Sequence, residues 1–87
     1  MALEETEGAL ANYTRSQQRT DNLFAAAKAS EAAAKIARAR LDAGTIDFLV
    51  VLDAERQLLQ ARDLLAQGQT QAATALVGVY RALAGGW

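Results

Sequence analysis

Apolar side chains recur every three to four residues along most of this 87-residue sequence. That spacing places them on one face of an α-helix, which completes a turn in 3.6 residues. The repeat is interrupted at Gly44 and resumes in an apolar run from Ile46 to Leu52 that only Asp47 breaks. The pattern predicts two helices, over about residues 3–43 and 46–84, joined by a turn at residues 43–45.

The residue content favours helix over strand on both sides of that turn. Alanine, leucine, glutamate, glutamine, arginine and lysine fill most positions, and the chain has no proline. The β-branched cluster at residues 46–51 lacks the alternation of a strand, so we predict helix there as well. Glu31 and Lys35 are spaced for an ion pair between successive turns of the first helix.

Three residues are expected to shape the turn. Gly44 is expected to end the first helix in the left-handed conformation, which costs glycine little. Thr45 is predicted to cap the second helix, its hydroxyl accepting a hydrogen bond from the amide of Asp47 or Phe48. The Asp47 carboxylate is expected in the first turn of that helix, beside unpaired amides.

Gly85 and Gly86 are expected to stop the second helix just before Trp87. A very short turn between two helices of about forty residues forces the second to run back along the first. The predicted fold class is therefore all-α, a single long antiparallel two-helix coiled-coil hairpin.

Both predicted helices carry apolar residues at heptad spacing, as coiled coils do. In the first helix this stripe comprises Leu3, Leu10, Tyr13, Phe24, Ala27 and Ala34. In the second helix it comprises Leu52, Leu59, Ala66, Ala73, Leu76, Tyr80 and Leu83. We expect these two stripes to pack against each other.

The second helix carries a further apolar stripe one position earlier, formed by Val51, Leu58, Leu65, Ala72 and Val79. One partner helix cannot cover so wide an arc. Either the arc belongs to the core of an ordinary helical bundle, or the hairpin packs laterally against others. The second is favoured because the chain has no third helix, and we expect a homo-oligomer such as an antiparallel four-helix bundle. The expected helix-packing seam comprises Leu52, Leu58, Leu59, Leu65, Leu76, Tyr80 and Leu83.

The sequence contains no catalytic or cofactor-binding constellation. Cysteine and histidine are absent, which removes disulfides, thiol nucleophiles and the commonest zinc sites. Ser16 and Ser30 lack a glycine elbow, and Asp42, Asp47 and Asp53 lack the spacing of a calcium loop. We therefore expect no enzyme activity, no metal and no cofactor.

The charge pattern argues against nucleic acid as a partner. The net charge is −1, and the basic residues from Arg15 to Arg40 alternate with acids and alanines. No apolar run approaches the ~18 residues of a membrane-spanning helix, so the chain alone is expected to be soluble. The role of Asp53 remains open. Its side chain could face a neighbouring chain, face a pore, or pair with Arg56 or Gln57 on its own helix.

Two segments carry a resemblance to a known family. The run "ARLDAGTIDFLVVLDAERQLLQARDLLAQ", followed by "LVGVYRALAGGW", resembles the C-terminal helical hairpin of TolC-type outer-membrane efflux channels. The likeness is to the lipoprotein branch that serves resistance-nodulation-division pumps, and it covers nearly the whole chain. In that family a homotrimer forms a long α-helical barrel through the periplasm. The resemblance implies that this chain is a fragment of such a channel, which exports small toxic compounds across the outer membrane of a Gram-negative bacterium.

The resemblance also implies roles for residues near the turn. The tip that docks a periplasmic adaptor, itself bound to an inner-membrane pump, would comprise Ala43, Gly44, Thr45, Ile46 and Asp47. The constriction would involve Leu41, Val50 and Asp53, with Asp53 in an acidic ring. Leu41 and Ile46 stand where better-known members carry a tyrosine and an arginine, and Val50 replaces a further acid. A constriction this apolar is expected to close by packing and dewetting rather than by hydrogen bonds.

The alternative is a freestanding helical hairpin that binds other proteins and is unrelated to efflux. It explains the heptad repeat and the apolar seam equally well. It does not explain the turn sequence together with the Tyr-Arg-Ala-Leu-Ala-Gly-Gly-Trp ending.

Overall fold

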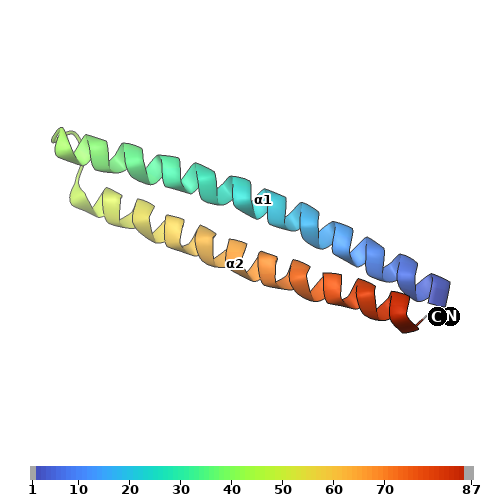
Figure 1. Ribbon diagram of the computed structural model, residues 1–87. Coiled ribbons are helices and arrows are strands. Elements are labelled where there is room, and N and C mark those ends of the chain that lie inside the picture. Colours follow the sequence, from blue (N-terminus) through green and yellow to red (C-terminus); the bar gives the residue numbers. More distant parts are fainter. Residues whose placement is uncertain (1, 86–87) are drawn as a thin grey trace. The chain divides into compact units, whose positions relative to one another are not determined.

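The computed structural model describes residues 2–85, and all regular structure within them is helical. Helix α1 spans Ala2–Asp42 and helix α2 spans Phe48–Gly85 (Figure 1). The predicted fold class, an all-α antiparallel two-helix hairpin, is confirmed. The first helix ends at Asp42, one residue before the predicted position 43, and the second begins at Phe48, two residues after the predicted position 46. Gly86 and Trp87, expected to end the helix and the chain, lie outside the described residues.

The chain divides into two compact units. The turn unit, Leu23–Leu65, contains the last part of α1, the turn and the first part of α2. The terminal unit contains residues 2–22 of α1 and 66–85 of α2 as described. In each unit a segment of α1 lies beside a segment of α2 (Figure 1).

Alanine dominates the core of the turn unit. Its buried side chains are Ala27, Ala34, Ala37, Val51 and Leu58. Half-buried residues continue the same faces at spacings of three and four, namely Leu23, Ser30, Leu41, Ala54, Ala61 and Leu65. Small side chains at a helix contact let the two axes approach closely, so the larger Val51 and Leu58 fill the space between them.

The core of the terminal unit is also small. Ala72, Ala75 and Val79 of α2 are buried. Half-buried Tyr13, Ser16 and Thr20 of α1 lie in the same unit. The Thr20 hydroxyl donates to the carbonyl of Ser16 at 2.8 Å, which satisfies this polar group within its own helix. The Arg19 guanidinium donates to the Gln71 amide oxygen and links the two helices of the unit.

The structure buries a different stripe of α2 from the one expected to face α1. Leu52, Leu59, Tyr80 and Leu83 are exposed, Leu59 over 64% of its surface. Among the other expected seam residues, Leu58 is buried and Leu65 and Leu76 are half-buried. The inward stripe is the one that begins at Val51 and lies one position earlier. The prediction that the Leu52 stripe packs against the first helix is therefore wrong.

Charged side chains explain which stripe is buried. Glu55 follows Leu52 by three residues, and Arg62 follows Leu59 by three, so both charges lie on the same face as the leucines. Burying that face would remove both charges from water, which costs free energy. The corresponding residues of the Val51 stripe are small and uncharged: Ala54, Ala61, Gly68, Ala75 and Ala82. The buried stripe therefore contains no charge, and a small residue follows each of its larger members, Val51, Leu58, Leu65 and Val79.

Candidate functional site

Backbone hydrogen bonds fix the turn between the helices. Gly44 has φ of 75°, the left-handed conformation that the sequence predicted. Its amide donates to the carbonyl of Leu41 at 2.9 Å, and the Thr45 amide donates to the carbonyl of Arg40 at 2.9 Å. This pair of bonds is the Schellman motif, which satisfies the last carbonyls of a helix. A Cβ at Gly44 would meet no atom within 4 Å, so glycine is required for its φ and not for space.

Thr45 caps the first helix instead of the second. Its hydroxyl donates to the carbonyl of Arg40 at 3.0 Å, so that carbonyl accepts two hydrogen bonds. The predicted N-cap role is wrong, because α2 begins only at Phe48. Asp47 precedes α2 directly instead of lying in its first turn, and its carbonyl accepts from the amide of Val50 at 3.1 Å.

The predicted docking residues Ala43 to Asp47 and the first three residues of α2, Phe48 to Val50, are together called the tip from here on, and they are mostly exposed. Ala43, Gly44, Thr45 and Asp47 are exposed, and Ile46 is half-buried. The first residues of α2 are apolar and exposed, with Phe48 at 56%, Leu49 at 68% and Val50 at 51%. Successive residues of a helix point about 100° apart, so these three side chains cover different sides of α2. The tip therefore presents apolar surface in several directions.

The three residues expected at the constriction do not share one environment. Val50 and Asp53 are exposed and lie three residues apart, which places them on one face of α2. Leu41 lies on the inward side of α1 and is half-buried. The Asp53 carboxylate accepts from Arg56 at 2.7 Å and from Gln57 at 2.8 Å. Of the roles left open for Asp53, pairing on its own helix is the one observed within this chain.

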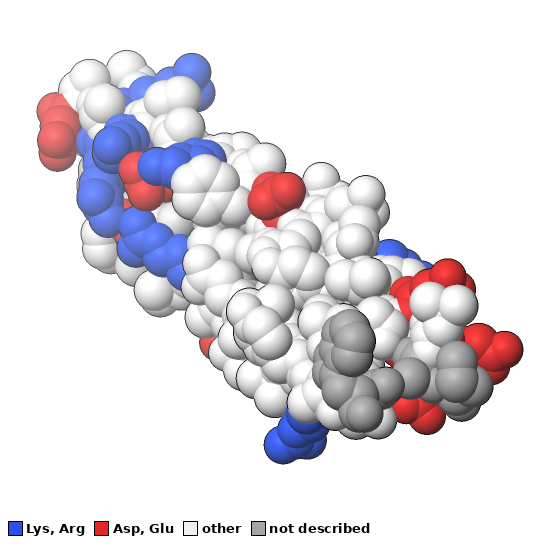
Figure 2. All heavy atoms as spheres, turned by 45° about the vertical axis from the view of Figure 1, so that its right-hand side comes forward, with Lys and Arg blue, Asp and Glu red and all other residues white. Residues whose placement is uncertain are grey.

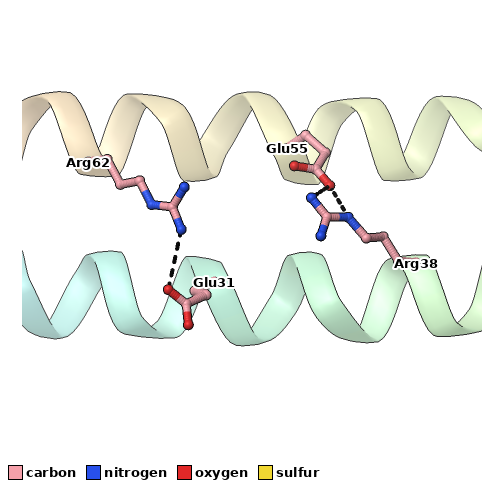
Figure 3. A network of polar contacts seen from close by, with 4 residues as sticks. All are labelled: Glu31, Arg38, Glu55 and Arg62. Carbon is pink, nitrogen blue, oxygen red and sulfur yellow. Dashed lines mark hydrogen bonds and ion pairs between the residues drawn. The ribbon is translucent and has the colours of Figure 1, made fainter.

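A cluster of ion pairs that the sequence analysis missed joins the two helices of the turn unit (Figure 3). Arg62 donates to Glu31 at 3.3 Å, and the Arg38 guanidinium pairs with Glu55. The acid is on α1 in the first pair and on α2 in the second. The predicted contact between Glu31 and Lys35 is also present, at 3.6 Å. The available signal was the seven-residue spacing of Glu31 and Arg38, mirrored by Glu55 and Arg62.

The charges around Glu31 favour the ionised form of its carboxyl group. The hydrogen bond from Arg62, together with the nearby charges of Lys35 and Lys28, lowers the pKa of Glu31 below its ordinary value. Because the folded-state pKa is the lower one, the contribution of Glu31 to stability is present above the unfolded-state pKa. That contribution is lost as pH falls through the folded-state pKa. The carboxylate is solvent-exposed, so salt screens the effect.

A groove runs beside these ion pairs on the turn unit. Glu31, Arg38, Glu55 and Arg62 line it together with Leu58 and Leu59. On the face that Figure 2 draws, basic side chains gather over the turn unit, and uncharged atoms cover much of the terminal unit. The described residues contain no group of three or more acidic, histidine or cysteine side chains that could hold a metal ion. Neither helix, over the part described, is long and apolar enough to cross a membrane.

The sequence matches known proteins along its length. Residues 1–85 match the family described as outer membrane efflux protein. The chain is 37% identical over 86 residues to the outer membrane protein OprJ of Pseudomonas aeruginosa, an alignment that covers 99% of this chain and 18% of OprJ. It is 43% identical over 58 residues to the pyoverdine export outer membrane protein OpmQ of Pseudomonas putida, covering 67% of this chain and 12% of OpmQ. The chain thus spans less than a fifth of the length of these relatives. No solved structure matches it.

Proposed function

Because the chain belongs to the outer membrane efflux protein family, we propose that it forms one helical hairpin of an outer-membrane efflux channel. In this proposal α1 and α2 are part of the helical wall that crosses the periplasm of a Gram-negative bacterium, and the tip is its periplasmic end. The channel exports small toxic compounds. The observation that carries the proposal is the match of residues 1–85 to this family.

The tip is proposed to dock a periplasmic adaptor protein, which connects the channel to an inner-membrane pump. Two features of the tip support this role. The Schellman motif at Gly44 holds the turn in one backbone conformation, so a partner meets a preformed surface. Phe48 and Leu49 add exposed apolar area that a docking partner can cover.

The constriction of the channel is proposed to lie where the tip meets the rest of α2, on the face that carries Val50 and Asp53. Asp53 supplies the negative charge of an acidic ring, while Arg56 and Gln57 hold its carboxylate in place. Val50 is exposed and cannot form side-chain hydrogen bonds. With Leu41 also apolar, closure depends on packing and on excluding water from the pore.

The exposed stripe of α2 is proposed to contact neighbouring helices of the channel wall. Leu52, Leu59, Tyr80 and Leu83 are exposed within this chain. In a homotrimeric channel a helix from another hairpin would cover this stripe and remove its apolar surface from water. Family membership favours this arrangement over a freestanding interaction module unrelated to efflux.

Cysteine cross-linking in the whole channel tests the docking role. The chain contains no cysteine, so each variant introduces a single thiol into this segment. With a bifunctional thiol–amine reagent, Thr45→Cys and Leu49→Cys should form cross-links to the adaptor in membranes. Gln60→Cys is the matched control, because Gln60 is exposed on α2 but lies outside the tip. Equal cross-linking at Gln60, or none at the two tip positions, would contradict the docking role.

A further inference from the structure

Two neighbouring side chains bind the carboxylate of Asp53, one at each oxygen. The Arg56 guanidinium donates to Oδ1 at 2.7 Å, and the Gln57 side-chain amide donates to Oδ2 at 2.8 Å. Arg56 and Gln57 follow Asp53 by three and four residues, so the three side chains emerge on one side of α2. The carboxylate therefore has a hydrogen-bond donor on each oxygen and a positive charge beside it.

The ion pair of Asp53 with Arg56 is open to water. The side chain of Asp53 is 52% exposed and that of Arg56 is 62% exposed. The acid next to Arg56 in the sequence, Glu55, pairs with Arg38 of α1. A solute that passes along this face of α2 can therefore reach the acid and the arginine together.

We propose that Arg56 is a specificity-determining residue of the channel, whose charge offsets that of Asp53 and leaves the constriction only weakly selective between cations and anions. Because the proposal takes Asp53 to line the pore, it rests on the proposed function. The 2.7 Å between the two groups is far shorter than the Debye length, which is about 8 Å at physiological ionic strength. A passing ion therefore interacts with the summed charge of the pair, which is close to zero.

The hydrogen bonds on the carboxylate act in the same direction as the arginine charge. A cation that bound directly to the Asp53 oxygens would compete with the donors of Arg56 and Gln57. Val50, exposed three residues before Asp53, adds apolar surface to the same face. A pore lined in this way suits amphipathic compounds of either charge, because it offers apolar contact and holds neither ion tightly.

A second arginine of α2 provides the comparison. Arg62 is also exposed and ion-paired, but its partner is Glu31 of α1, at 3.3 Å (Figure 3). Arg62 follows Arg56 by six residues, which turns it by about 120° around the helix axis. The charge of Arg62 therefore lies on a different side of α2 from Asp53.

Reversal potentials of the whole channel in a salt gradient test the role of Arg56. Arg56→Gln should raise the ratio of cation to anion permeability about threefold or more, because one unit charge a few ångströms from an ion changes its local concentration by that order. Arg56→Lys keeps the charge and should match the parent channel. Arg62→Gln is the matched control and should leave the ratio unchanged.

Asp53→Asn separates this proposal from the function on which it rests. This variant leaves the arginine without its acid, so the ratio should fall, in the opposite direction to Arg56→Gln. A fall with Asp53→Asn and no change with Arg56→Gln would overturn the role of Arg56 and leave Asp53 in the pore. No change with either variant would also remove Asp53 from the constriction. An equal rise with Arg62→Gln or with Arg56→Lys would likewise overturn the proposal.

Discussion

Gly44 shows how one residue determines the geometry of the turn. Its φ of 75° is open to glycine and strained for other residues, while the space around its Cα is empty. Two backbone hydrogen bonds and the Thr45 hydroxyl then satisfy the last carbonyls of α1. The direction in which the chain leaves α1 thus depends on a backbone conformation and not on side-chain packing.

Replacing this glycine should therefore destabilise the hairpin. We expect Gly44→Val to lower the free energy of unfolding by about 1–2 kcal/mol, because a β-branched residue is strained in the left-handed region. Gly44→Asn should cost less, since asparagine tolerates that region. Chemical denaturation of the three chains measures the difference. Equal stability of the valine and asparagine variants would show that the turn does not require a left-handed residue.

At the scale of the element, adjacent apolar stripes of α2 have different surroundings. The stripe through Val51 and Leu58 is buried, and the stripe through Leu52 and Leu59 is exposed. The two stripes are offset by one residue, which corresponds to about 100° of rotation around the helix axis. The cross-helix ion pairs lie at the edge of the buried stripe, where Glu55 and Arg62 keep contact with water.

A pair of neighbouring leucines tests this division. Leu58 is 5% exposed, so Leu58→Ala should cost about 2 kcal/mol or more of stability through lost burial and the cavity left behind. Leu59 is largely exposed, so Leu59→Ala should change stability by less than ~0.5 kcal/mol. Thermal melts at concentrations low enough to keep the chain monomeric provide the comparison. A larger loss at Leu59 would reverse the assignment of the two stripes.

At the scale of the whole molecule, the small core and the exposed apolar surface are consistent with a chain that functions in contact with others. The buried apolar residues are mostly alanine, while leucines on the outside of α2 stay exposed. A hairpin of this size gains limited stability from its own core. Covering the exposed leucines with neighbouring helices of the channel wall would add to that stability.

The constriction proposal also makes a prediction for the whole channel. Val50→Asp should raise the single-channel conductance and cation selectivity, because a second acid on the face of Asp53 would hydrate an apolar constriction. Val77→Asp is the control, since Val77 is similarly exposed on α2 but lies outside the tip. Planar-bilayer recordings of the two channels decide the point. Identical conductance in both variants would argue against a pore-lining position for Val50.

The sequence by itself determined the two helices, the turn and several local contacts. Helix propensity and the apolar repeat are local properties, and Gly44 is the single break that the turn requires. The contact of Glu31 with Lys35 depends only on spacing within one helix. The pairing of Asp53 with Arg56 depends on such spacing too, but the sequence offered it only as one of several possibilities. The family resemblance likewise rested on two continuous segments of the sequence.

Only the tertiary structure decided which stripe of α2 faces α1 and how the turn bonds. Both stripes are apolar, and heptad spacing alone does not choose between them. The packed helices bury the stripe with uncharged neighbours and leave Glu55 and Arg62 in ion pairs at its edge. Thr45 fits an N-cap by sequence, yet its hydroxyl bonds back to Arg40 because the Schellman turn places that carbonyl within reach. Pairs such as Arg38 with Glu55 require the register of two helices. Register belongs to neither helix alone, so a pattern read along one helix cannot supply it.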